Sequence, residues 1–548
     1  MNPNKMLKYA VLSLPFIILI IFLVYPVAAV IIQGLLFGPG SSFIEVVSSQ
    51  VSYRVFMFTF SQAILSTALA LVLGIPGALI ISKLRFRGKS TIRALLTIPF
   101  VLPPIVVVVG FLQVFGTRGI LDSLLMMLTN SSESLLNLAT GYLGIILAHA
   151  FYNIPLFLLM VSASLERLDP QLEEAAEILG ASPIYKFRKV TFPHIRSSIA
   201  AASVLTFLFC FMSFPIVLAL GEGNFITLEV QIWNAFRFFD YGEAASLALV
   251  QLLITVCLAY LYFKSGDSDQ NTAGQTAYIK TVSFSDLSKK YRALILVYAI
   301  LIVMLVIGPM VSIIRSAIYD PNTNSYTMRG FENLLNPGID GAFIPMVNSV
   351  FYAGLATLFS VILGLLIAYA RKSDTRMLPE LSSMITLLPL GVSAITIAYG
   401  LMIAIAVPLG ISSNPWPLIV VAQTMIGIPF SARAIEIAKS KIGPYILEQA
   451  ESLGANSLHK MFYVELPLLA PGILVAAVFS FAMAIGEMSA TIFLASTQNI
   501  TLAISIYRDL AIKKFAEAGA ASLLLVAVCI IAFLLIERLS ENGYRGAL

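Results

Sequence analysis

The sequence predicts an all-α polytopic membrane protein with twelve transmembrane helices, arranged as two parallel repeats of six helices. Composition is the first reason: 59% of the 548 residues are hydrophobic, 11% are charged, and the mean hydropathy is +0.91. A soluble protein of this length needs more polar side chains to cover its surface. The second reason is a series of apolar stretches, and the third is a set of landmarks that recur at constant spacing in the two halves.

Each apolar stretch is close to the ~20 residues that a helix needs to cross a bilayer. In lipid the backbone groups must bond within their own segment, so spans of this length are expected to be helices. The twelve predicted spans are residues 10–36, 56–82, 94–116, 142–164, 198–220, 244–263, 293–315, 346–370, 382–408, 417–438, 469–494 and 518–536.

Lys and Arg residues concentrate in alternate loops. The segment 83–93 holds five basic residues and no acidic one, and the segments 165–197 and 371–376 are also rich in Lys and Arg. The loops on the other side carry one basic residue each, and these are residues 37–55, 117–141 and 221–243. Because cytoplasmic loops carry the excess of Lys and Arg, the sequence predicts a multi-pass protein of the cell membrane with both termini in the cytoplasm.

The two halves share landmarks at fixed offsets, which indicates an internal duplication. With six spans in each half, both copies have the same orientation in the membrane, as in a parallel repeat. The predicted domains are residues 1–264 and 291–548, joined by a polar cytoplasmic linker at 265–290. At an offset of 274 residues Glu174 aligns with Glu448, Gly180 with Gly454 and Pro193 with Pro467, and at an offset of 290 Gly74 aligns with Gly364, Pro99 with Pro389 and Gly110 with Gly400.

Two polar loops, residues 165–197 and 439–468, interrupt the apolar pattern at equivalent places. In the first loop Asp169 and Pro170 predict the start of a helix, because Asp is a good N-cap and Pro suits the first helical position. Gly180 suits the left-handed residue that ends such a helix. The second loop repeats this plan. Each loop is therefore predicted to hold two short helices joined at a glycine.

The spacing in these loops resembles the EAA loop of ATP-binding-cassette importer permeases, which reads Glu-Ala-Ala, three residues, Gly, nine residues, an aliphatic residue, one residue and Leu-Pro. Phe192 stands where Leu is usual, and Gln449 stands where the first Ala is usual. The resemblance covers nearly the whole chain, and it is closest to the fused two-domain permeases for ferric iron and thiamine. The matching positions are Glu174, Ala175, Ala176, Gly180 and Pro193 in the first loop, and Glu448, Ala450, Gly454, Leu466 and Pro467 in the second.

This resemblance implies the fold of a type I importer permease and a function as the transmembrane subunit of an importer. In that family the EAA loop is the coupling helix, which docks in a cleft of a cytoplasmic ATPase subunit. The implied partners are two copies of that ATPase, an extracytoplasmic solute-binding protein and the lipid bilayer, with no nucleic acid. The implied substrate is ferric iron or thiamine. The chain itself is expected to bind no cofactor, since the partner subunit uses the ATP.

Few ionisable residues lie within the predicted spans, and such residues are functional candidates. Glu487, in the eleventh span, is the clearest, and Ser213 is its counterpart at the offset of 274. Both are predicted to line the translocation path, where a carboxylate would favour a cationic substrate. The competing interpretation is that Glu487 only forms a hydrogen bond between two helices. Pro-containing segments at 97–105 and 387–395 are predicted to break their helices within the membrane.

An ion-coupled secondary transporter is the alternative function, because six-plus-six parallel repeats also occur in that class. Such carriers usually need several intramembrane charges, and they have no need for two matched cytoplasmic loops. The sequence contains no GxxxxGK[ST] phosphate loop, so the chain is not expected to be an ATPase or another enzyme. No catalytic residue and no metal site is predicted, and His149, His194 and His459 lie far apart in the sequence.

Overall fold

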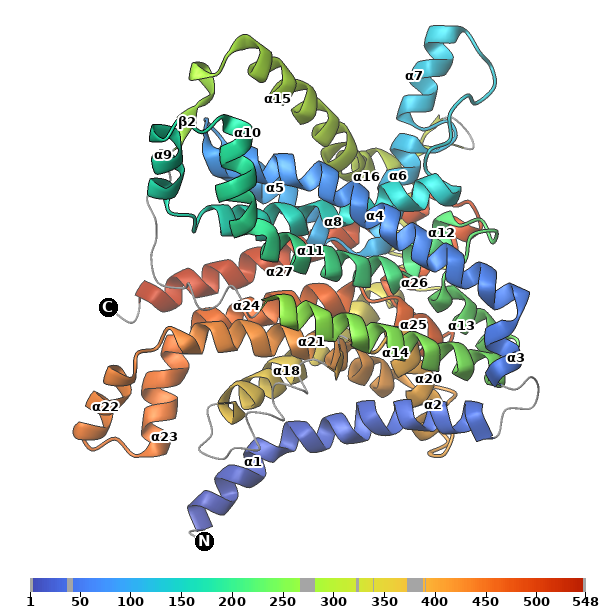
Figure 1. Cartoon of the computed structure of the whole chain (residues 1–548). Helices are drawn as coiled ribbons and strands as arrows, with labels where there is room; N and C mark the ends of the chain where they lie inside the picture. Colours follow the sequence, from blue (N-terminus) through green and yellow to red (C-terminus); the bar gives the residue numbers. More distant parts are fainter. Residues whose placement is uncertain are drawn as a thin grey trace.

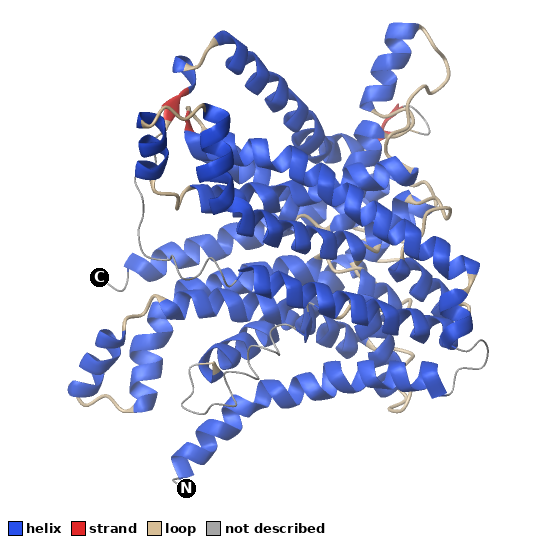
Figure 2. Cartoon of the chain, viewed as in Figure 1, coloured by secondary structure: helices blue, strands red, loops and turns tan. Residues whose placement is uncertain are grey.

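Nearly all of the described chain is helical, and most helices run along a common direction in one bundle (Figure 1, Figure 2). The computed structural model describes residues 3–36, 43–266, 281–321, 325–338, 340–371, 388–389 and 391–545. Strands are confined, within these residues, to two short ladders. An α-helical membrane fold is therefore confirmed.

In the described part of the first half there are fourteen α-helices, two short π-helical segments (η1 and η2) and one strand. Their bounds are α1 Pro3–Leu19, η1 Ile20–Val24, α2 Tyr25–Leu36, α3 Phe43–Ser48, α4 Gln50–Lys83, β1 Leu84–Arg85, α5 Lys89–Val101, α6 Pro104–Phe115, α7 Ile120–Thr129, α8 Gly141–Leu165, α9 Pro170–Ile178, α10 Pro183–Lys186, η2 Phe187–Thr191, α11 Phe192–Phe211, α12 Pro215–Leu220, α13 Leu228–Arg237 and α14 Tyr241–Gly266.

The second half begins with a short strand and a 3-10 turn (η4). Its elements are β2 Val282–Ser283, η4 Phe284–Asp286, α15 Lys289–Ile302, η5 Val303–Ile307, α16 Gly308–Ser316, β3 Tyr319–Asp320, β4 Ser325–Tyr326, α17 Arg329–Leu334, α18 Phe343–Ala370, α20 Ala394–Leu401, η6 Met402–Ala406, α21 Trp416–Ser440, α22 Pro444–Ser452, α23 Ser457–Lys460, η7 Met461–Glu465, α24 Leu466–Ile485, α25 Ser489–Leu494, α26 Leu502–Ala511 and α27 Phe515–Arg545.

Eleven helices of the described chain are long and apolar enough to cross a membrane. The ninth predicted span, residues 382–408, is described only in part, because residues 382–387 and 390 lie outside the described residues. Its remainder holds a shorter apolar helix, Ala394–Ala406. The total of twelve therefore stays a prediction. The eleven helices are Val11–Gln33, Gln50–Lys83, Pro104–Thr129, Gly141–Leu165, Pro183–Phe211, Tyr241–Leu261, Lys289–Ser316, Phe343–Ala370, Trp416–Ser440, Met461–Ile485 and Phe515–Ala532.

Equivalent glycines make equivalent contacts inside each half. A Cβ added to Gly74 on α4 would lie 2.6 Å from Cβ of Phe157 on α8, and one added to Gly364 on α18 would lie 2.7 Å from Cβ of Ser431 on α21. Phe157 and Ser431 are themselves separated by the offset of 274. The two halves are thus repeats in space as well as in sequence, and each glycine lets two helices pack closely.

The first membrane-spanning segment of each half, which contains α2 in the first half and α16 in the second, packs against the other half. A Cβ added to Gly110 on α6 would lie 2.4 Å from the carbonyl oxygen of Pro309 on α16, and one added to Gly400 on α20 would lie 2.6 Å from the carbonyl oxygen of Pro26 on α2. Each half thus contributes its first membrane-spanning helix to a contact with the other half. These two contacts hold the repeats together.

One predicted helix break is confirmed, and two predicted spans are wrong at one end. The break expected at 97–105 is confirmed, since α5 ends at Val101 and α6 begins at Pro104. The fifth span of each half, predicted as 198–220 and as 469–494, is too long at its end. Each is one long helix followed by a separate short one, because residues 212–214 and 486–488 are not helical.

Both described chain ends and both polar loops lie at one end of the bundle, on the left in Figure 1. The predicted linker at 265–290 is described only in part, since residues 267–280 lie outside the described residues. Its last part forms β2, which pairs in parallel with β1 through Leu84 with Val282 and Arg85 with Ser283. The start of the second half is therefore tied to the α4–α5 connection of the first.

Candidate functional site

The first polar loop folds as two short helices with a glycine between them. Asp169 caps α9, with its side chain accepting a hydrogen bond from the amide of Gln171 at 2.9 Å. Gly180 has a φ of +77°, and the amide of Ala181 donates to the carbonyl of Ala176 at 3.0 Å. This is the usual helix ending at a left-handed glycine. The expected helix, glycine break and second helix are all present.

The second loop repeats this geometry. Gly454 ends α22 with a φ of +86°, and the amide of Ala455 donates to the carbonyl of Ala450 at 3.0 Å. Asn456 caps α23 by accepting from the amide of His459 at 2.8 Å. Figure 1 shows that α9 with α10 and α22 with α23 project as two similar hairpins from the same end of the bundle.

One ion pair occurs at the same place in both loops. Lys186 pairs with Glu177 in the first loop, and Lys460 pairs with Glu451 in the second. Both residues of each pair are related by the offset of 274. The pair joins the two short helices across the glycine turn, so it stabilises the angle between them. The sequence analysis did not identify it, although the equal nine-residue spacing in both copies is a signal.

The tips of the loops expose large apolar side chains. Ile178 and Leu179 are 86% and 87% exposed in the first loop, and Leu453 is 90% exposed in the second. Of the residues of the EAA pattern, Ala175, Glu448 and both prolines are exposed, while Glu174 and Ala450 are half-buried. Exposed apolar groups gathered at a projecting tip are typical of a contact surface for a partner.

Glu173, the neighbour of the predicted Glu174, connects the first loop to the bundle. Its Oε1 accepts from Nζ of Lys83 at 2.5 Å and from Oγ1 of Thr191 at 2.7 Å. Burial alone would raise the pKa of Glu173, but the hydrogen bonds from Lys83 and Thr191 and the charge of Lys83 outweigh burial and lower it. Lys83 ends the long helix α4, so this carboxylate joins the loop to a membrane-spanning helix.

A cavity of 220 Å³ lies between the two halves. Both predicted path residues, Ser213 and Glu487, are among the residues that line it. Each lies at the break between the fifth long helix of its half and the short helix that follows. The wall is mostly apolar and comes from both halves, and its other residues include Pro103, Pro104, His149, Tyr152, Asn153, Phe209, Met212, Ile216, Pro389, Val392, Phe430, Phe479, Met483 and Met488.

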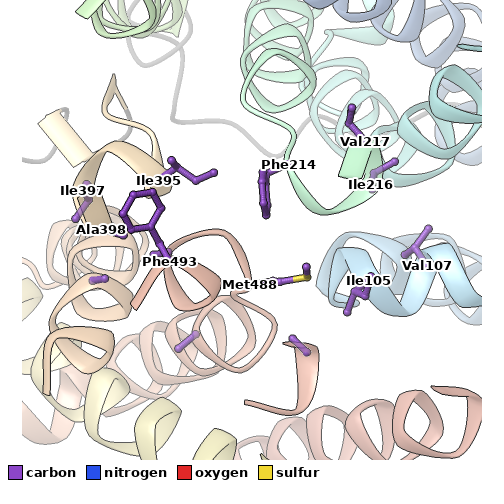
Figure 3. Close-up of a cluster of buried hydrophobic side chains, with 14 of the residues drawn as sticks. Ile105, Val107, Phe214, Ile216, Val217, Ile395, Ile397, Ala398, Met488 and Phe493 are labelled. Atoms are coloured by element: carbon purple, nitrogen blue, oxygen red, sulfur yellow. The ribbon is translucent and has the colours of Figure 1, made fainter. Parts of the chain in front are cut away.

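Close to this cavity, buried hydrophobic side chains of both halves come together (Figure 3). Phe214 and Met488, which follow the two path residues, are related by the offset of 274 and lie near the middle of this view. Phe214 is fully buried and Met488 is 1% exposed. The helix breaks are therefore held by packing, which keeps Ser213 and Glu487 in fixed positions.

The first-half wall of the cavity carries neutral polar groups. Oγ of Ser213 lies 2.7 Å from Nε2 of His149, within hydrogen-bond distance. Asn153, one turn further along α8, donates from Nδ2 to the carbonyl of His149 at 2.8 Å. His149 and Asn153 are 2% and 1% exposed, so Ser213 is the member of this group that reaches the cavity most openly, at 8%.

The second-half wall carries the carboxylate of Glu487. Its Oε1 accepts from the amide of Ala490 at 2.7 Å, and its Oε2 accepts from the amide and the hydroxyl of Thr491 at 2.9 and 2.7 Å. Glu487 thus caps the short helix α25. These bonds go to the helix that directly follows in the chain, so Glu487 has a structural role at the break as well as a place at the cavity wall.

Glu229 is a further buried acid that sequence reasoning missed. It is 1% exposed on α13, and its Oε1 accepts from Nε2 of Gln251 at 2.7 Å. Ser393 and Glu487 are close enough to interact with it. Glu229 lies outside the predicted spans, so the hydropathy pattern predicted that it lies in a loop outside the membrane. The amphipathic pattern of residues 228–237 was the available signal, since its apolar side is buried against the bundle.

Comparisons with known proteins agree with this architecture. Residues 70–265 and 345–546 each match the family described as binding-protein-dependent transport system inner membrane component. The thiamine transport system permease protein ThiP of Escherichia coli is 25% identical over 515 residues, which cover 93% of each chain. A Haemophilus influenzae protein, FbpB 1, named for a ferric transport system permease, is 26% identical over 510 residues, covering 89% of this chain and 78% of its own.

Among solved structures, a bacterial ABC transporter involved in the import of the acidic polysaccharide alginate matches 50% of this chain and 97% of its own, at 16% identity and a TM-score of 0.42. The family match stands on the sequence alone and covers both repeats. The chain therefore belongs to the family of the inner membrane components of binding-protein-dependent transport systems.

Proposed function

We propose that this chain is the complete transmembrane part of an ATP-binding-cassette importer, with both permease domains in one polypeptide. Its cargo enters from an extracytoplasmic solute-binding protein and passes through the cavity between the two halves. The observation that carries the proposal is the pairing of that cavity with two equivalent hairpins at one end of the bundle. Two hairpins fit two ATPase subunits, one under each half.

The hairpins are proposed as the coupling elements. Each offers exposed apolar side chains at its tip, an acidic helix and an internal ion pair that holds its shape. ATP is bound and hydrolysed by the partner subunits, and the permease chain needs no cofactor. Both termini and both hairpins face the cytoplasm in this proposal, since basic residues dominate the loops on that side.

The cargo is proposed to be thiamine or ferric iron, because permeases named for these two solutes are similar over most of the chain. The test is reconstitution of the full chain with its ATPase and binding protein in lipid vesicles. ATP-dependent accumulation of radiolabelled thiamine or of radioactive ferric citrate is expected, at a stoichiometry of two ATPase subunits per chain. Uptake that persists without ATP but follows a sodium or proton gradient would contradict the proposal.

A further inference from the structure

We propose that the cavity between the halves is a binding site for an organic cation that carries a flat aromatic ring. This class includes thiamine and does not include a ferric ion. The inference rests on the importer function proposed above and adds the chemistry of the cargo. It follows from the size of the cavity, from the side chains that line it, and from the charge that those side chains carry.

The cavity is larger than a metal ion requires. Its 220 Å³ is several times the ~30 Å³ that one water molecule takes in the liquid. Small-molecule sites in proteins are mostly apolar concavities with a few placed polar groups that fix orientation. This cavity has the same character, which suits a molecule with an apolar body rather than a single hydrated ion.

Aromatic and thioether side chains from both halves contribute to the apolar wall, beside prolines and aliphatic residues. The aromatic rings are those of Tyr152, Phe209, Phe430 and Phe479, and the thioethers are those of Met212, Met483 and Met488. Aromatic faces attract cations and stack with flat rings. Methionine adds a flexible, polarisable contact to aromatic groups. Together these residues form a wall suited to a planar, positively charged heterocycle.

The polar groups of the wall are arranged asymmetrically. Glu487 gives the second half a carboxylate, while Ser213 gives the first half a neutral hydroxyl at the equivalent position. Glu487 accepts hydrogen bonds from the start of α25, among them one from the amide of Ala490 to Oε1 at 2.7 Å. Its position at the cavity wall offers negative charge to the cargo. No Lys or Arg is among the described lining residues, so the cavity favours positive charge.

Ferric iron needs a different set of ligands. A hard cation is held by several oxygen donors, most of them carboxylates or other anionic groups. Among the described lining residues this wall offers one carboxylate, and hydrogen bonds from α25 already reach both of its oxygens. Throughout the described residues, moreover, no three His, Cys, Asp or Glu side chains come together as a metal site. The wall therefore selects the organic cation of the two candidate cargoes.

The experiment measures equilibrium binding of radiolabelled thiamine to the full-length chain in lipid nanodiscs, without binding protein or ATP. Saturable binding is expected, and excess ferric citrate should not displace it. Glu487→Gln should weaken binding by about tenfold, since it removes the charge but keeps the size of the side chain. Phe430→Leu keeps the charge and removes a ring, and it should weaken binding by roughly fivefold.

Glu465→Gln is the matched control, because Glu465 has the same 8% exposure as Glu487 and does not line the cavity. It should leave thiamine binding unchanged. Melting temperatures are recorded for every variant, so a folding defect is visible. Absence of thiamine binding to the wild-type chain, displacement by ferric citrate, or an equal loss in Glu465→Gln would overturn the proposal. ATP-driven uptake by the reconstituted transporter tests the importer function separately, and it can succeed where cavity binding fails.

Discussion

Gly180 and Gly454 show how a single residue type determines the shape of each hairpin. Their φ angles of +77° and +86° belong to the left-handed region, and an added Cβ would meet no atom within 4 Å at either site. The requirement for glycine is therefore conformational, since the surrounding space is open. A substituted residue would therefore disturb the hairpin through backbone strain. A substitution at either site tests the effect of that strain on the hairpin.

Replacing both glycines by valine should uncouple the hairpins while the bundle stays folded. An L-residue in the left-handed region costs ~1–2 kcal/mol, and a β-branched residue is among the least tolerant. ATP-driven uptake should fall by about tenfold in the Gly180→Val, Gly454→Val variant. The measurement is uptake in vesicles together with the ATPase retained on the purified chain.

Gly410→Val is the control for this experiment. Gly410 also has a positive φ, +68°, and open space around it, but it precedes α21 at the end far from the hairpins. It carries the same local strain and should leave ATPase binding normal. Equal uptake by the double variant and the wild type would show that the glycine bends are not needed for coupling.

The contact between Lys83 and Glu173 should transmit movement of the first hairpin to α4. The pair is partly exposed, with 36% and 19% of the two side chains accessible, so a coupling energy of only roughly 0.5–1 kcal/mol is expected. A double-mutant cycle of Lys83→Met and Glu173→Gln measures it from melting curves. The comparison is the same cycle for Lys186→Met and Glu177→Gln, and a smaller coupling energy is expected there because the Glu177 side chain is 50% accessible.

The pH dependence of this contact has a defined sign. The pKa of Glu173 is lowered in the folded protein, so its stabilising contribution is present above the unfolded pKa and is lost as the pH falls through the folded pKa. Stability of the wild type should therefore decline more steeply than that of Glu173→Gln below the ordinary pKa of Glu, 4.5. Parallel acid curves for the two proteins would rule out this contribution.

At the scale of the elements, the reciprocal exchange of first helices joins the two repeats. α6 of the first half packs on α16 of the second, and α20 of the second packs on α2 of the first. Both contacts depend on a glycine whose Cα approaches a carbonyl oxygen of the other half. The short helices α12 and α25 then fill the space at the breaks and place the cavity residues.

Gly110→Ala should destabilise this junction, because the added Cβ would lie 2.4 Å from the backbone carbonyl oxygen of Pro309. The helices must separate to accept it, and overpacking of this kind costs ~1–3 kcal/mol. A lower melting temperature in detergent is the expected result. Gly354→Ala is the matched control: it lies on the exposed side of α18 with open space around it. There alanine should stabilise the helix by up to ~1 kcal/mol.

Across the whole molecule, the two chain ends and the two hairpins share one end of the bundle. We predict that this end is cytoplasmic. A fluorescent protein that matures only in the cytoplasm should fluoresce when fused to either terminus. A cysteine placed at Asn130, which lies in the loop after α7, should react with a membrane-impermeant thiol reagent from outside the cell. Fluorescence from neither fusion, or protection of the Asn130 cysteine, would reverse the orientation.

The sequence by itself determined the membrane class, the duplication and the two hairpins, because these depend on local properties. Hydropathy fixes which segments enter lipid, and the Asp–Pro and Gly signals fix where the hairpin helices begin and end. Those signals act through neighbouring residues in the chain, so they can be recognised without a structure. The offset of 274 residues between the repeats makes Ser213 the counterpart of Glu487.

Only the tertiary structure decided how the two halves meet. Hydropathy could not separate α11 from α12 or α24 from α25, because the apolar run continues through each break and the short helices are buried by protein rather than lipid. Glu229 and Glu173 were missed for a related reason. Their environments come from Gln251 and from Lys83, partners that are 22 and 90 residues away in the chain. Such pairings depend on packing between helices, so they cannot be predicted from the neighbouring residues in the sequence.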